Sequence, residues 1–283
     1  MGSPLSARAI AVDRLPEALA LLSRAARDNL LLLDLAARLG EPPPPGEMAT
    51  ELCGAFRGDE LVGVATLRPT IAFDARIPAD ALEALLPLVE ALDVGLVKCE
   101  PRCVERLWSH LSRRRRHRVW VDRFETCYAV DRTTAQLVAN TDGRITRAAG
   151  EGDLEPLVFA ARESLREEDR PDPFAGDVRG FRRWVRGRIP RARVVESSGQ
   201  VSFVGYADVQ RDVGWLLQGI YTWPEARRRG FAAGGTSALC EEAFAAGADH
   251  VQLAVVDGND AAERLYEGLG FKPFGRVRTI LFT

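Results

Sequence analysis

The sequence Arg227-Arg228-Arg229-Gly230-Phe231-Ala232 stands between a strand-like run and the start of a long run with helical character. Glycine has no Cβ, so the backbone at Gly230 can approach a ligand closely. The first N–H groups of a helix have no partner inside the helix and lie at the positive end of its dipole. Arginine side chains beside them add donors whose geometry suits phosphate oxygens. The stretch therefore predicts a loop that holds a pyrophosphate.

A second stretch, residues 259–271, reads NDAAERLYEGLGF. Together with the first stretch it resembles the paired cofactor signatures of the GCN5-related N-acetyltransferase (GNAT) family. The first signature is Arg or Gln, two residues, Gly, one residue, then Gly or Ala, which Arg227, Gly230 and Ala232 match. Either signature alone is weakly specific, whereas the two at the family's usual separation are far more so. The resemblance covers the whole second half of the chain.

The resemblance implies that the cofactor is acetyl-CoA and that a primary amine attacks its thioester directly in a ternary complex. The backbone of Ile220 and Thr222 would bond the pantetheine arm, and the Ile220 N–H would also face the thioester oxygen. The N–H groups of residues 228–233 would face the pyrophosphate, and Asn259 would contact the cofactor arm. The implied cofactor-binding residues are Ile220, Tyr221, Thr222, Arg227, Arg228, Arg229, Gly230, Phe231, Ala232, Ala233 and Asn259.

Catalysis needs a proton donor for the departing thiolate and a base for the amine. A free thiol has a pKa of about 8.5, and the phenol of Tyr266, which the resemblance places beside the sulfur, would supply the proton. Family members can carry a glutamate base on the strand before the loop, but this chain has Leu216 there. The remaining candidates are Glu167, Glu168, Asp169 or a chain of waters. We select Glu168, because a clustered carboxylate can have a raised pKa.

The expected fold class is α/β, with two acyl-CoA N-acyltransferase-like domains, each a mixed, mostly antiparallel sheet flanked by helices. The two halves show the same order of elements, which indicates a tandem repeat. The domains are expected at 1–135 and 144–283, joined by a polar linker that ends at 140–143. The predicted helices are 15–27, 30–39, 79–92, 103–111, 153–166, 178–188, a long one ending at 246, and 259–268. The predicted strands are 52–56, 61–67, 94–99, 119–130, 144–147, 194–196, 201–209, 213–222, 251–256 and 277–282.

The first half contains no counterpart of residues 227–232. We therefore expect residues 1–135 to form a degenerate GNAT-like domain that does not bind the cofactor. Its expected role is to cover the sheet of the second domain or to complete the acceptor cleft.

The chain of 283 residues has 38 basic and 40 acidic residues, a net charge of -2, which gives no reason to expect nucleic acid or a membrane surface as a partner. The first residues lack the order of a signal peptide, and no apolar run is long enough to span a membrane. The five cysteines lack metal-ligand spacing, so we expect no metal and a cytoplasmic location. We also expect His250 at the surface and the arginine run 113–116 on a solvated face.

Two other functions compete with that of a transferase. A dinucleotide-binding enzyme is disfavoured, because the glycine-rich turn at 230–235 does not directly follow its strand and has Ala232 in place of the second glycine. An acyl-CoA-binding regulatory or scaffold module stays open, since the usual glutamate base is missing. The acceptor is open as well, either a small-molecule amine or a protein N-terminus. The acidic loop 167–173 favours a cationic acceptor, whereas the arginines of residues 179–186 would suit a carboxylate. The oligomeric state is not indicated.

Overall fold

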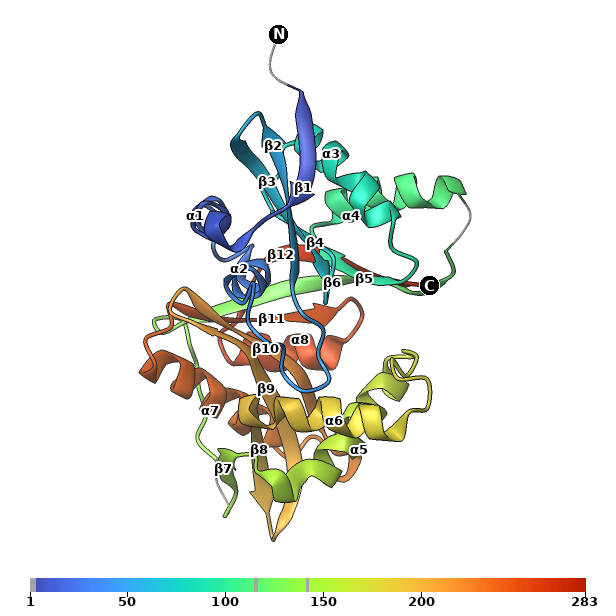
Figure 1. Ribbon diagram of the computed structural model, residues 1–283. Coiled ribbons are helices and arrows are strands. Elements are labelled where there is room, and N and C mark those ends of the chain that lie inside the picture. Colours follow the sequence, from blue (N-terminus) through green and yellow to red (C-terminus); the bar gives the residue numbers. More distant parts are fainter. Residues whose placement is uncertain (1–3, 115–116, 141–142) are drawn as a thin grey trace. The chain divides into compact units, whose positions relative to one another are not determined.

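The computed structural model describes residues 4–114, 117–140 and 143–283, and Figure 1 labels its elements. The chain divides into two compact units. Unit 1 contains Met1–Pro43, Met48–Glu125 and Gly275–Thr283, and unit 2 contains Pro44–Glu47 and Thr126–Phe274. Residues 141–142 of the expected linker and 115–116 of the arginine run lie outside the described residues.

Unit 1 has a four-stranded antiparallel sheet in the order β1-β2-β3-β4. Ile71, just before β4, forms a parallel bridge with β5, since its N–H donates to Leu96 O (2.7 Å) and its carbonyl accepts from Lys98 N (3.0 Å). The end of β12 pairs antiparallel with β5. These strands are β1 (Leu5–Ala9), β2 (Glu51–Arg57), β3 (Glu60–Arg68), β4 (Ala72–Phe73), β5 (Gly95–Cys99) and β12 (Lys272–Phe282).

Helices cover both faces of the unit 1 sheet. Along β2, Leu52 and Phe56 belong to the apolar cluster with the leucines of α1 and α2, whereas Cys53 and Ala55 belong to the cluster with α3 and α4. Successive side chains of a strand point to opposite faces, so the two helix pairs lie on opposite sides. The helices are α1 (Leu15–Ser23), α2 (Leu30–Ala37), α3 (Ala79–Glu90) and α4 (Pro101–Leu111).

Unit 2 has the strand order β6-β11-β10-β9-β8-β7. The pair β10 and β11 is parallel, and the pairs β9–β10, β8–β9 and β7–β8 are antiparallel, so the sheet is mixed. Its strands are β6 (Val119–Asp131), β7 (Ile145–Ala148), β8 (Ala192–Ser197), β9 (Gln200–Arg211), β10 (Gly214–Thr222) and β11 (His250–Val256). Its helices are α5 (Leu154–Glu167), α6 (Val178–Arg188), α7 (Phe231–Ala245) and α8 (Asp260–Gly268).

Two of these helices lie on opposite faces of β9. The Tyr206 ring lies 3.9 Å from the guanidinium carbon of Arg188 at the end of α6. The neighbouring Gly205 faces Leu239 of α7. Side chains alternate along a strand, so α6 and α7 cover different faces. On the α7 side Gly235 approaches the Phe203 ring too closely to leave room for a Cβ, which explains a glycine inside this helix.

The two repeats have the same order of longer elements: a strand, two helices, three strands, a helix, a strand, a helix and a strand. This confirms the expected α/β class with two mixed, mostly antiparallel sheets flanked by helices. The last strand of each repeat passes from one unit into the other. Residues 126–131 of β6 belong to unit 2, and residues 275–282 of β12 belong to unit 1.

Most predicted elements are present within a few residues of their expected ends, but β1 and β4 were not predicted. The expectation of a surface position for His250 is wrong. His250 is 3% exposed on β11, where its ring lies against Gly214 and its Nε2 is 2.9 Å from Gln252 Oε1. Within the described parts of the chain, no helix combines the length and apolar character needed to cross a membrane.

Candidate functional site

Strand β10 separates from β11 after Leu216, the third residue of the strand. The parallel pairing joins Trp215 to Val251 and Leu216 to Gln252, and β10 then continues to Thr222. Backbone groups on this side of residues 217–222 therefore have no ladder partner from β11. An extended ligand that carries amides can bond there as a strand would. Ile220 and Thr222, both predicted from the sequence, lie on this separated segment.

A β-bulge interrupts β10 at the same place. Gln218 pairs with Tyr206 and Tyr221 with Val204, so two residues of β10 stand opposite the single residue Gly205. Gly219 adopts the left-handed conformation, with φ of 56°. A bulge turns the residues next to it away from the regular ladder. The residue that follows is Ile220, whose N–H is the predicted donor to a thioester oxygen.

The predicted phosphate loop follows β10 through the 3₁₀ turn Pro224–Ala226 and leads into α7. Arg228 and Gly230 both have positive φ, 56° and 85°. Backbone in such a turn directs successive N–H groups to one side and forms a concave anion-binding surface. No side chain of the described residues caps α7, and its first backbone bond runs from Gly234 N to Gly230 O. The N–H groups of residues 231–233 therefore remain available.

The arginines of the loop have different surroundings. Arg227 turns back to β10, where its Nε donates to Thr222 O (3.0 Å) and its Nη2 to Glu167 Oε1 (2.6 Å). Arg229 lies near the helix start, with its guanidinium carbon 5.6 Å from the centre of the Phe231 ring. Arg144, which the sequence analysis did not select, lies 4.4 Å from the same ring and next to Gly230. Arg228 is exposed.

Tyr266 lies in α8 and is 6% exposed. Burial raises the pKa of its phenol, and the nearby Cys240 of α7 adds to the shift. The ring centre is 5.6 Å from that of Phe271, the last residue of the second signature. At neutral pH the phenol is therefore a protonated group, which suits a proton donor and not a base.

Asn259 is the N-cap residue of α8. Its Oδ1 accepts a hydrogen bond from Ala262 N (3.2 Å) and caps the helix. The side-chain amide nitrogen is the part of the residue left to contact a cofactor arm.

The two glutamates that are candidates for the base, Glu167 and Glu168, have different contacts at the end of α5. Glu167 Oε1 accepts from Arg227 and lies 3.4 Å from the Tyr221 hydroxyl. Tyr221 is 5% exposed, and burial together with Glu167 raises the pKa of its phenol. Glu168, the selected base, contacts Ser164 (3.4 Å) and Arg170 (3.5 Å) in the adjoining turn. Glu167 thus contacts both β10 and the loop.

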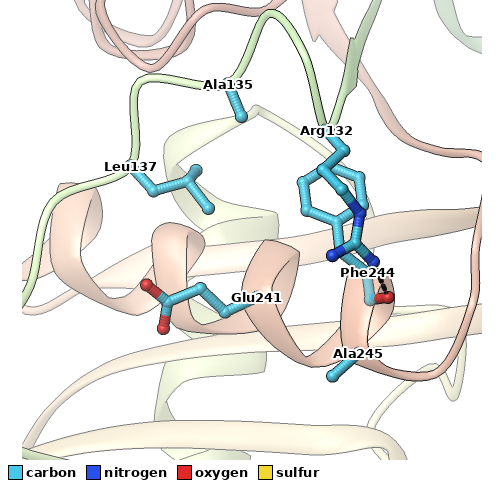
Figure 2. A pocket seen from close by; sticks show the side chains of 6 residues that line it. All are labelled: Arg132, Ala135, Leu137, Glu241, Phe244 and Ala245. Carbon is cyan, nitrogen blue, oxygen red and sulfur yellow. Dashed lines mark hydrogen bonds between the residues drawn. The ribbon is translucent and has the colours of Figure 1, made fainter.

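Figure 2 shows a pocket of about 370 Å³ at the other end of α7. Its wall is formed by Arg132, Ala135, Leu137, Glu241, Phe244 and Ala245, and the Arg132 guanidinium donates to Phe244 O. A helix rises 1.5 Å per residue, so Phe244 lies about 20 Å along the axis from Phe231. This pocket contains none of the predicted residues and is separate from the loop.

Comparison with known proteins finds one family model that matches part of the chain. Residues 158–271 match the model of the acetyltransferase (GNAT) family. This segment contains the separated strand, the loop and Tyr266. Among curated proteins no sequence matches the chain.

Solved structures match nearly the full length. A protein from Drosophila has a TM-score of 0.74 at 13% identity, and the match covers 98% of this chain and 98% of that one. A GCN5-related N-acetyltransferase from Sphaerobacter thermophilus has a TM-score of 0.61 at 15% identity and coverages of 98% and 95%. A tandem GNAT protein from the clavulanic acid biosynthesis pathway has a TM-score of 0.60 at 13% identity and coverages of 99% and 98%. At these identities the likeness is one of fold.

Proposed function

We propose, starting from the match of residues 158–271 to the acetyltransferase (GNAT) family model, that the chain moves an acetyl group from acetyl-CoA to a primary amine in a ternary complex. The observation that carries the proposal is the separation of β10 from β11 directly before an uncapped helix start. An open strand edge suits the amides of a pantetheine arm, and the helix start suits a pyrophosphate. Acetyl-CoA contains both groups in the same order.

Residues 228–233 supply the phosphate side of the proposed site. Their backbone N–H groups line the concave turn and the first turn of α7, which contains no acidic residue. The guanidinium groups of Arg229 and Arg144 lie beside Phe231 and add positive charge at the same place. Arg227 acts differently in this proposal, since its bonds to Thr222 and Glu167 hold the end of β10.

The reaction proposed for this site is direct attack of a neutral amine on the thioester carbonyl. The carbonyl oxygen gains negative charge as the nitrogen bonds to carbon, and the Ile220 N–H stabilises that charge. The bond from carbon to sulfur then breaks, and Tyr266 gives its proton to the thiolate. The amine proton passes to a base, for which Glu168 remains the candidate, with Glu167 as the alternative that contacts β10.

A second candidate is an acyl-CoA-binding module that senses or scaffolds without catalysis. The observation that favours it is Leu216, an apolar side chain, 7% exposed, at the strand position where a glutamate base is expected. Both candidates require acetyl-CoA binding. Release of free thiol in the presence of an amine library separates them, because only the transferase produces it.

The phosphate site is tested with Gly230→Glu. The new carboxylate would stand among the N–H groups that face the pyrophosphate, and we expect it to abolish detectable acetyl-CoA binding. Isothermal titration measures it. The matched control is Gly247→Glu, at the other end of α7, where φ is also positive (92°) and the space is open. The control accounts for backbone strain, so equal affinity of the two variants would contradict the proposed site.

A further inference from the structure

The bulge at Gly219 is in contact with two side chains from the α6 side of the sheet. A Cβ on Gly219 would lie 2.9 Å from Cδ2 of Tyr206 and 3.3 Å from Nη2 of Arg188. A residue with a side chain would not fit there without displacing them. The Tyr206 ring and the Arg188 guanidinium therefore fill the space beside the bulge that precedes the Ile220 N–H.

Arg188 is held from several directions. Its side chain is 12% exposed, its Nη2 donates to Asp208 Oδ2 (2.7 Å), and its guanidinium carbon lies 3.9 Å above the Tyr206 ring. The Trp184 ring is 5.0 Å away on the same helix. A buried guanidinium with a charged partner and two aromatic neighbours has little freedom to move. It can therefore hold a neighbouring backbone in place.

The ion pairs continue from Arg188 to a segment of the first half of the sequence. Asp208 Oδ1 lies 3.5 Å from Arg191 Nη1, and Arg191 Nη2 bonds Glu47 Oε1. Glu47 belongs to Pro44–Glu47, a short segment of unit 2 that is separate in sequence from the rest of that unit, Thr126–Phe274. Within that segment Gly46 packs against the backbone of Trp184, and Pro45 packs against Gly187. The segment is therefore fixed to the helix that carries Arg188.

We infer that Arg188 is a positioning residue for the thioester carbonyl and that Glu47 sets the position of Arg188 through Arg191 and Asp208. The inference rests on the proposed function, because it concerns the donor Ile220 N–H. Ion pairs join Glu47 to Arg191, Arg191 to Asp208 and Asp208 to Arg188, so negative and positive side chains alternate along this series. Without the Glu47 carboxylate, Arg191 can move toward Asp208. Asp208 then forms a weaker ion pair with Arg188. The Gly219 backbone then relaxes, and the hydrogen bond to the carbonyl lengthens.

The test uses the full-length protein and acetyl-CoA labelled with ¹³C at the carbonyl. A hydrogen bond from Ile220 polarises the carbonyl and moves its NMR resonance downfield relative to free acetyl-CoA. We expect Arg188→Lys to lower kcat about 10- to 100-fold. The carbonyl resonance of bound acetyl-CoA should also move back upfield, toward its position in free acetyl-CoA. Acetyl-CoA affinity should change far less than kcat, since the phosphate contacts of residues 228–233 are untouched. Glu47→Gln should change the resonance in the same direction by a smaller amount.

The charge-reversed pair Glu47→Arg with Arg191→Glu tests the series itself and should restore most of the wild-type resonance. Glu41→Gln is the control, since this carboxylate is exposed on the same stretch of chain. If Arg188→Lys does not fold, Glu47→Gln decides the matter. An unchanged resonance and kcat in the variants that fold would overturn the inference and leave the proposed function standing. A wild-type protein that binds no acetyl-CoA would remove both.

Discussion

The phenol of Tyr266 lies between α8 and Cys240 of α7, and its pKa is raised above the ordinary value by burial. A tyrosine in solution ionises near pH 10. The phenol of Tyr266 therefore stays protonated over the whole range in which an acetyltransferase would be assayed. A proton donor with this property should impose no alkaline limit on the rate below about pH 10.

Variants of Tyr266 and of the two glutamates test the proton donor and the base separately. Tyr266→Phe should lower kcat about 100-fold with little change in acetyl-CoA affinity, because the ring still packs on Phe271. Glu168→Gln should lower kcat/KM for the amine about 10- to 100-fold with little change in acetyl-CoA affinity. Glu167→Gln is the comparison, since it removes the carboxylate that contacts Tyr221 and Arg227. A normal rate in Glu168→Gln, with the loss in Glu167→Gln, would assign the base to Glu167.

At the scale of single residues, the sequence indicates the residues whose role depends on their immediate neighbours in the chain. It does not indicate those whose contacts depend on the fold. Gly230 was predictable, because a left-handed residue directly before a helix favours glycine. The neighbourhood of Arg144 was not, since this residue is far from the loop in sequence and reaches it only through the pairing of β7 with β8. The contacts of Glu167 depend on where α5 ends, and one residue more or less in a helix rotates a side chain by about 100°.

At the scale of elements, a buried carboxylate joins three strands of unit 1. Glu125 of β6 is 3% exposed, and it accepts hydrogen bonds from Lys98 of β5 (2.6 Å) and from Thr279 of β12 (2.6 Å). Burial acts to raise the pKa of this carboxyl, but Lys98, Thr279 and Arg123 outweigh it and lower the pKa to about 2. The charged form is thus favoured in the folded state, and the three strands depend on it.

A glutamate pKa lowered by folding gives stability that is present above the unfolded value, near pH 4.5, and is lost as the pH falls toward 2. A shift of this size corresponds to about 3 kcal/mol in the free energy of unfolding. Glu125→Gln should remove about that amount at pH 7, because it leaves Lys98 without its buried partner. Urea unfolding at pH 7, 5 and 3 measures it. The variant should lose less stability than the wild type between pH 5 and 3, and parallel losses would show that Glu125 is not the group responsible.

Element order was predictable where apolar residues follow a clear period. The helix α3 and the strand β9 are examples, since each has a continuous buried face. The strand β1 was not predictable, because none of its residues is buried and its alternation is weak. The surface position expected for His250 was wrong for a related reason. A histidine at a strand start is as suited to the surface as to the interior, and only the open space over Gly214 provides the site for its ring.

At the scale of the whole molecule, the sequence predicted a repeated domain but gave no sign of the exchanged last strands. Both β6 and β12 are long strands whose buried residues lie from the middle of the strand to its end. Each could pair with β5 or with β11 on pattern alone, and the choice depends on contacts far apart in the chain. A cut at residue 135 would therefore remove β6 and Pro44–Glu47 from unit 2 and leave residues 275–283 without unit 1. Experiments on this protein require the full chain.

The repeats differ at the proposed cofactor site, which fixes how many acetyl-CoA molecules one chain should bind. In unit 2, β10 runs six residues beyond its last pairing with β11. Its counterpart β4 ends at Phe73, two residues after the bridge between Ile71 and Val97, so no separated strand edge is found among the described residues of unit 1. Pro78, which has no N–H, caps α3, and the Asp80 carboxylate lies in the first turn, where a phosphate would be repelled.

We therefore expect one acetyl-CoA per chain, bound by unit 2 alone. Isothermal titration of the wild type should give a stoichiometry near one, and Gly230→Glu should abolish the binding altogether. Asp80→Asn removes the negative charge at the start of α3 and should still leave the stoichiometry at one, because the strand edge for the pantetheine arm is missing in unit 1. A second equivalent in the wild type, or remaining binding in Gly230→Glu, would mean that β4 and the turn after it can open to hold a cofactor, and that the first repeat has kept a working site.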